Sequence, residues 1–335
     1  MENRTIREQI QETESRELSP RAFLSANTAG RLHPLEECPL RTPFQRDRDR
    51  IIHCNTYRRL MHKTQVFLFP QGDHYRTRLT HTLEVSQIAR TIARGLRLNE
   101  DLAEAIAMGH DLGHTPFGHA GEYALRDVSP FFFRHSEQSL RVVDLLERDG
   151  KGLNLTAEVR DGILCHSDGM PWAGTWEGRV VRYADKIAYI NHDIEDAIRA
   201  GILTENDIPW EARYKLGQSK SQRIAALITS LVENSREDVR MDPETAAQYE
   251  NLKAFLFEAV YKNPVAKGEE GKAKDIVRKL YELLAGNPDK LPQDYQDIRE
   301  REGVPRAVCD YISGMSDRYC VAVFEEFFIP KPWGM

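Results

Sequence analysis

Residues 109–122 read GHDLGHTPFGHAGE, and three histidines and two acids fall within this short stretch. A histidine that is buried for packing needs one hydrogen-bond partner, so a cluster this dense is hard to explain by packing alone. Imidazole and carboxylate groups bind Mn, Fe, Ni, Zn or Co, and Mg where oxygen ligands and substrate phosphates dominate. The stretch therefore predicts a divalent-metal site that includes His110 and Asp111.

The segments on the N-terminal side of this cluster have helical spacing. Their apolar residues predict one helix over about 80–97 and a second that begins near Asn99. Gly109 and Gly113 flank the His-Asp pair, so the second helix is expected to end there. Because glycine permits a sharp turn, we expect the two adjacent side chains to face the same way.

Helical patterns continue along most of the chain, and alternating strand patterns are almost absent. Only Gln65–Phe69 looks extended. Further helices are expected near 117–126, 136–149, 156–166, 178–200, 220–235, 243–262, 272–286 and 305–327. The sequence therefore predicts an all-α protein with one large core.

The chemistry-bearing residues are unevenly distributed along the chain. Residues 1–40 are polar and rich in turn-forming residues, and we interpret them as an irregular N-terminal arm or an oligomer contact. Residues 41–205 hold most of the histidines and are expected to form the functional core. Residues 206–335 are plainer and are expected to be a C-terminal helical region packed on that core.

Composition limits the class of protein. The 335 residues are 41% hydrophobic and 29% charged with a net charge of −6, which is typical of a globular protein and disfavours a surface that coats nucleic acid. The five cysteines include no CxxC pair, which favours a reducing compartment. No secretory signal or run of roughly 20 apolar residues is evident, so we expect a cytoplasmic protein without a membrane anchor.

A metal site needs further ligands from other segments. His81 and Asp185 both lie in strongly helical stretches, and facing helices commonly supply metal ligands from their inward faces. The order His, His-Asp, Asp on helices matches the HD-domain metal phosphohydrolases. This resemblance predicts one divalent cation per chain.

Four longer segments carry a closer resemblance, which extends over about residues 41–325. They are RDRDRIIHCNTYRRLMHKTQVF (46–67), RTRLTHTLEVSQIAR (76–90), HDLGHTPFGHAGE (110–122) and DYISGMSDRYC (310–320). In these segments the chain resembles the HD-domain deoxyguanosine triphosphate triphosphohydrolase-like family. The resemblance implies an HD-domain helical bundle with additional C-terminal helices. It also implies hydrolysis of a deoxynucleoside triphosphate (dNTP) to a deoxynucleoside and inorganic triphosphate.

The resemblance also implies roles for individual residues. The metal ligands that it implies are His81, His110, Asp111 and Asp185. His119 and Glu122 fall on the family's catalytic pair, and their i, i+3 spacing places both on one helix face. We expect His119 to act as a general acid whose pKa Glu122 raises. His135 falls on a further family histidine and is expected to contact phosphate, and His114 to lie near the phosphates.

The substrate contacts are less directly indicated. Arg58, Arg59, Lys63, Arg76 and Arg78 form a basic stretch that is expected to surround an anion, with Arg78 favoured because it lies one helical turn before His81. Lys186 follows the ligand Asp185 and is expected to reach a phosphate. By similarity, Tyr189 stacks along the sugar, Asp193 accepts the 3′-hydroxyl, and Gln65 and Val66 lie against the sugar.

Three alternatives remain open. The first is an HD phosphodiesterase that cuts single-stranded nucleic acid or cyclic dinucleotides, which the acidic net charge disfavours. The second is a regulator that binds dNTP without turnover. The third concerns His166, which with His135 lies in the interval where some HD proteins bind a second metal. By resemblance, a homo-oligomer and activation by a dNTP at a second site are also expected.

Overall fold

The computed structural model describes residues 4–65, 76–263 and 268–331. Over these residues the protein is helical, with isolated bridges at Arg31–Thr156 and Thr64–Thr77 but no strand, so the prediction of an all-α fold is confirmed. The extended segment expected over Gln65–Phe69 lies, except for Gln65, outside the described residues. None of the described helices is long and apolar enough to cross a bilayer.

The α-helices are α1 (Ile6–Glu17), α2 (Pro43–Ile52), α3 (Asn55–Arg59), α4 (Arg78–Gly95), α5 (Glu100–Gly109), α6 (Gly118–Val128), α7 (His135–Arg141), α8 (Glu147–Gly150), α9 (Ala157–Cys165), α10 (Trp176–Arg199), α11 (Trp210–Leu216), α12 (Lys220–Asn234), α13 (Pro243–Leu256), α15 (Glu270–Gly286), α16 (Gln293–Glu302), α17 (Val304–Ser313) and α18 (Asp317–Phe328). Short 3-10 turns lie at Ser25–Asn27, Leu60–His62, Glu205–Asp207 and Pro288–Lys290, and π-helical turns at Val142–Leu146 and Phe257–Tyr261.

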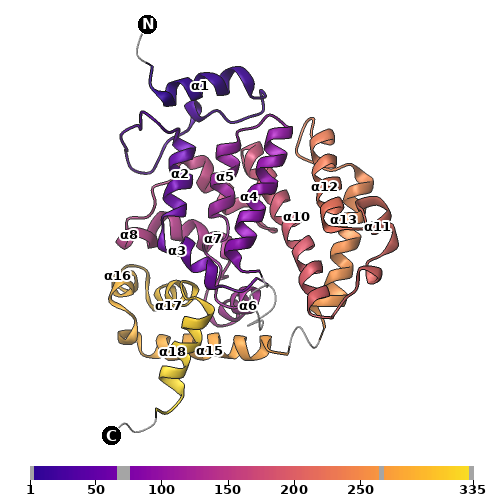
Figure 1. Ribbon diagram of the computed structural model, residues 1–335. Helices are drawn as coiled ribbons and strands as arrows, with labels where there is room; N and C mark the ends of the chain where they lie inside the picture. The colour runs from indigo at the N-terminus through magenta and orange to yellow at the C-terminus, as the bar shows by residue number, and fades with distance from the viewer. Residues whose placement is uncertain (1–3, 66–75, 264–267, 332–335) are drawn as a thin grey trace.

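The N-terminal arm is more ordered than its composition predicts. Thr5 and Glu8 form a reciprocal capping box that begins α1, so the expectation of an irregular arm is wrong over this helix. The Glu14 carboxylate, which is buried, accepts hydrogen bonds from the backbone N–H of Ser25 and the side chain of Asn99. Figure 1 shows α1 lying across the end of the helical body near α2 and α5.

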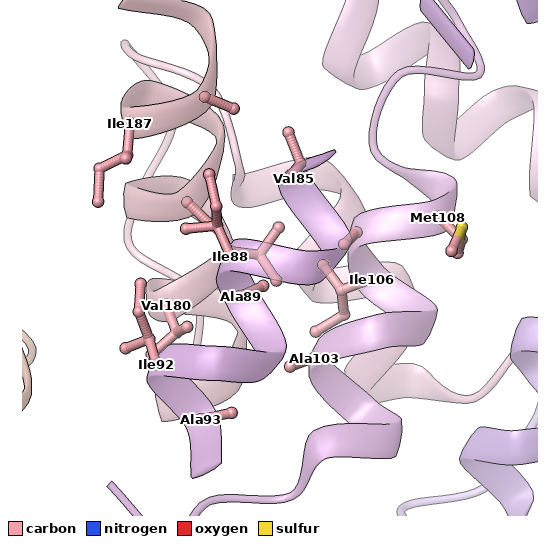
Figure 2. Packing of buried hydrophobic residues seen from close by; sticks show 14 of the residues in the cluster. Val85, Ile88, Ala89, Ile92, Ala93, Ala103, Ile106, Met108, Val180 and Ile187 are labelled. Carbon is pink, nitrogen blue, oxygen red and sulfur yellow. The ribbon is translucent and has the colours of Figure 1, made fainter. Parts of the chain in front are cut away.

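The central helices begin and end close to the predicted positions. The Asn99 side chain accepts the backbone N–H groups of Asp101 and Leu102 and so caps α5, which ends at Gly109 directly before the His-Asp pair. Helix α4 packs against both α5 and α10. Figure 2 shows apolar side chains of the three helices meeting, among them Ile88 of α4, Ile106 of α5 and Val180 of α10.

Over the described residues, the apolar interior forms two clusters rather than the single core expected. The first runs from Phe44 to Val260 and continues across residue 205, so the apolar packing does not change at the predicted division, which stays a prediction. The second joins α6 to α15, α16, α17 and α18, which Figure 1 shows together at the C-terminal end. The helix expected over 305–327 is two helices, separated at Gly314–Ser316. Helix α6, which carries His119, therefore belongs to the C-terminal cluster.

Candidate metal-centred site

Side chains from three segments converge on one point in the interior. His81 comes from α4, His110 and Asp111 from the end of α5, and Asp185 from the middle of α10. Oδ1 of Asp185 lies 3.0 Å from Nε2 of His81 and 3.8 Å from Nε2 of His110. Asp111 lies 3.5 Å from Nε2 of His110 through Oδ1 and 4.0 Å from Nε2 of His81 through Oδ2. The structure thus brings together the four residues predicted as metal ligands.

The chemistry of this quartet suits a divalent cation. Nδ1 of His110 donates to the carbonyl of Ala107 at 2.7 Å, which leaves Nε2 with its lone pair. That Nε2 is buried and has no hydrogen-bond partner among the residues that the structure describes. Burial alone would raise the pKa of Asp111, but nearby positive charge, including that of Arg78, outweighs it and holds that pKa well below 3.8. Two imidazole nitrogens and two carboxylates facing one point form an N/O ligand set.

The two glycines beside the His-Asp pair serve packing rather than an unusual backbone turn. Neither Gly109 nor Gly113 has a positive φ. A Cβ added at Gly113 would lie 2.1 Å from the backbone nitrogen of Ser139, and one at Gly109 would lie 2.5 Å from the Ile163 side chain. The predicted role of glycine in the turn is therefore corrected to close approach of α7 and α9.

A second group of side chains lies beside the quartet on α6 and α7. The Glu122 carboxylate lies 3.3 Å from Nδ1 of His119 and 3.1 Å from Nδ1 of His135, and it also accepts the backbone N–H of His135. Burial alone would lower the pKa of His135, but the hydrogen bond and charge of Glu122 raise it above 6.5. The same contacts hold the pKa of Glu122 well below its usual range. The His119 side chain is 64% exposed, so its ring is accessible to solvent.

Two further histidines connect the quartet to this group. The ring of His114 stacks on that of His135 with centroids 4.1 Å apart, and its Nε2 lies 3.5 Å from Asp111. Nε2 of His166 lies 3.3 Å from Nε2 of His135, while its Nδ1 donates to the Ile163 carbonyl. Asp111, His114 and His135 form a further set of possible metal ligands, whose ligand atoms lie within 4.8 Å of one another. His166 therefore lies between the quartet and the side chains of α6 and α7.

The predicted basic stretch is only partly directed at the site. Arg78 is buried and donates to Asp111 at 2.8 Å. Arg76 instead contacts the carboxylates of Glu84, Glu195 and Asp196. Arg58 and Arg59 bond to groups on or just before their own helix, and Lys63 lies in the interior. Sequence periodicity alone could not identify these partners.

The remaining substrate candidates lie along α10 and near Gln65. Lys186 pairs with Asp168 at 2.6 Å, and Tyr189 is half-buried on the same helix. Asp193 is buried; one carboxylate oxygen accepts from Tyr261, and the other has no hydrogen-bond partner in the described part of the chain. Oε1 of Gln65 is likewise buried and without a partner among the described residues. Val66 lies outside the described residues.

Two residues lie behind the quartet: His192, whose role the sequence left open, and Glu84, which the sequence did not single out. Nδ1 of His192 lies 3.4 Å from Nδ1 of His81, and its Nε2 contacts the Glu84 carboxylate. These contacts support the neutral tautomer of His81 in which Nδ1 carries the proton, because His192 lies beside Nδ1 as the outer partner. In that tautomer Nε2 can bind a cation. His192 lies seven residues after Asp185 on α10, and Glu84 lies three after His81 on α4. That helical spacing was the available signal.

The helical fold and the His, His-Asp, Asp cluster define an HD-domain protein, and the matches to two family models agree with this. The HD domain model matches residues 78–190, and the phosphohydrolase-associated domain model matches residues 239–326. Among solved structures, a hypothetical protein from Aquifex aeolicus is 20% identical, with a TM-score of 0.47 over 85% of this chain and 68% of that chain.

Full-length relatives identify the family. A deoxyguanosinetriphosphate triphosphohydrolase-like protein of Caldanaerobacter subterraneus subsp. tengcongensis is 54% identical over 98% of this chain and 97% of its own length. Proteins of the same description are 47% identical in Desulfatibacillum aliphaticivorans and 48% identical in Clostridium perfringens, over 98% and 97% of this chain and 99% and 98% of those proteins. The chain belongs to the deoxyguanosinetriphosphate triphosphohydrolase-like proteins.

Proposed function

We propose that the protein is a hydrolase that converts dNTPs, of which dGTP is the first candidate, to a deoxynucleoside and inorganic triphosphate. The observation that carries the proposal is the convergence of His81, His110, Asp111 and Asp185 next to the Glu122–His135 pair. The names of the full-length relatives support the substrate class. The roles below are proposed for this chain's own residues.

The quartet would hold one divalent cation, which when bound supplies positive charge to phosphate oxygens and lowers the pKa of a water molecule. The protein adds its own charge, because a triphosphate carries about three to four negative charges near neutral pH. Arg78 holds Asp111 in place through Nη1, and its buried Nε has no partner among the described residues, so it can donate to a phosphate oxygen. We assign the phosphate tail also to His114, whose Nε2 lies 3.5 Å from Asp111, and to Lys186, which follows Asp185 on α10.

The leaving group in this reaction is the 5′-oxygen of the sugar, which needs a proton. We assign His119 as the proton donor, because its ring is accessible and Glu122 fixes its Nδ1. Glu122 is shared with His135, and the contact raises the pKa of His135, which favours its imidazolium form. A charged His135 beside the quartet would stabilise negative charge that develops on the phosphate.

The sugar would lie where buried acceptors lack partners. Asp193 offers one carboxylate oxygen, and Gln65 an amide oxygen, that have no hydrogen-bond partner among the described residues. Because leaving a buried acceptor unpaired costs about 1–3 kcal/mol, a hydroxyl that reaches these atoms gains binding energy and specificity. We assign Asp193 to the 3′-hydroxyl, with Tyr189 along the sugar face four residues earlier on α10.

The decisive experiment is product analysis of the purified protein with each dNTP, in the presence of Mn, Mg, Co, Ni, Fe or Zn. We expect equal amounts of deoxynucleoside and tripolyphosphate by ion-exchange chromatography. Asp111→Ala should abolish both products. As a control, His62→Ala alters an exposed histidine and should leave both products unchanged.

Other outcomes would favour the alternatives. Nucleoside monophosphates released from single-stranded DNA, with no tripolyphosphate from dNTPs, would indicate a phosphodiesterase. Binding of dNTPs without turnover across the metals would indicate a sensor. Oligomerisation and activation by a second dNTP stay predictions. Light scattering and the same assay with mixed dNTPs test them, and elemental analysis tests the expected one metal per chain.

A further inference from the structure

Lys63, a buried residue outside the metal quartet, joins the C-terminal helices to the loop before α6. Its Nζ donates to the carbonyl of His114 at 2.5 Å and to that of Ser313, at the end of α17, at 2.7 Å. Burial lowers the pKa of Lys63 to about 7, but the amine and the ammonium both carry the two hydrogens that these carbonyls need. A cation enclosed in this way is an uncommon use of lysine.

Asp317, the first residue of α18, makes a matching connection from the other side. Its carboxylate accepts the backbone N–H of Phe117 at 2.9 Å and that of Thr64 at 2.9 Å, together with the Thr64 hydroxyl. The Asp317 side chain is 4% exposed. We call Lys63 and Asp317 the clasp. Lys63 binds the carbonyl of His114, at one end of the loop from His114 to Phe117, and Asp317 binds the N–H of Phe117, at the other end. Asp317 also binds Thr64, the residue next to Lys63.

The conformation of that loop needs outside support. Phe117 has φ 62° and ψ 24°, in the left-handed region, which is strained for a bulky residue and persists only where the surroundings hold it. Within the described part of the chain, no side chain makes an N-cap hydrogen bond at the start of α6. The hydrogen bond from Phe117 to Asp317 is therefore a main local restraint on where α6 begins.

The loop and α6 carry the chemistry assigned above. His114 precedes the loop's turn, and His119 and Glu122 lie in the first turns of α6. The metal quartet comes from α4, α5 and α10, which belong to the first apolar cluster, whereas α6 packs with α15–α18. The position of the His119–Glu122 pair relative to the quartet thus depends on how the two clusters are joined.

We propose that Lys63 and Asp317 are positioning residues that set the His119–Glu122 pair against the metal quartet from the C-terminal helices. The inference deepens the proposed function and rests on it. The region matched by the phosphohydrolase-associated domain model includes Asp317, so in this proposal that region positions the reacting groups. Neither clasp residue needs to touch substrate for this.

The test compares Asp317→Ala, Asp317→Asn and Lys63→Met with a matched control. Asp47→Asn alters another buried carboxylate that accepts both the backbone N–H and the hydroxyl of one threonine, Thr156, at 2.8 and 2.7 Å. A displacement of about 1 Å at a catalytic group can cost roughly 100-fold in rate. We expect Asp317→Ala and Lys63→Met to lower kcat by about 10- to 100-fold, with KM changed less than about threefold and metal content unchanged.

Rescue and hydrogen exchange separate positioning from simple loss of stability. Asp317→Asn keeps one acceptor oxygen and should recover part of the lost kcat, whereas Asp47→Asn should keep wild-type kcat at temperatures where it is folded. Amides of residues 117–122 should lose protection in Asp317→Ala, lose less in Asp317→Asn, and keep it in Asp47→Asn. Equal effects of the Asp47 and Asp317 variants on kcat and exchange would overturn the proposal.

The exchange measurement also keeps the two proposals distinguishable. A wild-type protein without dNTP hydrolysis would refute the proposed function, and the protection of residues 117–122 would still show whether the clasp holds α6. Unchanged protection in the folded Asp317 variants would refute the clasp even if the wild-type enzyme hydrolyses dNTPs. If Asp317→Ala does not fold, Asp317→Asn and Lys63→Met give the same comparison.

Discussion

Nδ1 of His135 lies 3.1 Å from the carboxylate of Glu122, whereas Nδ1 of His119 lies 3.3 Å from the same carboxylate. The sequence pairs Glu122 with His119, because the two residues are one helical turn apart. The tertiary structure adds His135 from the start of α7 and makes Glu122 the shared acceptor of two histidines. Removing Glu122 should therefore change both histidines at once.

The first prediction concerns the charge on His135. In Glu122→Gln the pKa of His135 should fall below its wild-type value, because the partner that outweighs the effect of burial is gone. An NMR titration of the ring nitrogens measures this directly. Glu137→Gln alters an exposed acid two residues away on the same helix and serves as the control. An unchanged His135 pKa in Glu122→Gln would contradict the assignment.

The second prediction separates metal binding from proton transfer. His119→Ala should lower kcat by roughly 10²–10⁴-fold, because a general acid contributes about that factor. Its side chain is 64% exposed and lies outside the quartet, so elemental analysis should find metal content and stability as in wild type. His81→Ala should instead lose the metal. A metal-free His119→Ala protein would show that His119 is a ligand.

The third prediction concerns Glu84, behind the quartet. Glu84→Gln should weaken divalent-metal affinity by roughly 10- to 100-fold, because it removes the carboxylate that orients His192 and, through it, His81. Competition with a fluorescent chelator measures the affinity. Glu137→Gln again provides a control outside the quartet. Equal metal affinity in the two variants would mean that His192 does not orient His81.

The fourth prediction links stability to pH through Glu177, at the start of α10. This side chain is fully buried and accepts the backbone N–H groups of Phe23 and Asn99. Burial raises the pKa of Glu177 to about 7 from 4.5. Between these values the folded protein binds more protons than the unfolded chain, so this group lowers the free energy of unfolding as pH rises.

The Glu177→Gln variant tests this linkage, since an amide stays neutral and its oxygen can still accept both N–H groups. Urea unfolding from pH 5 to pH 8 should show that the variant gains stability relative to wild type, by up to about 3 kcal/mol, because one pKa unit corresponds to about 1.4 kcal/mol. Parallel pH profiles for the two proteins would show that Glu177 is ionised throughout.

The sequence by itself determined the helical class, the limits of most central helices and the identity of the quartet. Those features depend on local periodicity, on an N-cap such as Asn99, and on a dense string of histidines and acids. The same periodicity missed α1, because a polar helix with a capping box has no apolar stripe of the usual kind. It also merged α17 and α18 into one helix, because apolar spacing continues across Gly314.

Only the tertiary structure decided which residues meet across separate helices. Periodicity shows that a helix face is apolar but not which helix covers it, so the split into two apolar clusters and the place of α6 in the second were not predictable. The same holds for Lys63, which the sequence places among phosphate-facing cations and the fold encloses between two carbonyls. The partner of a long charged side chain is set by three-dimensional packing, because its reach exceeds any spacing along one helix.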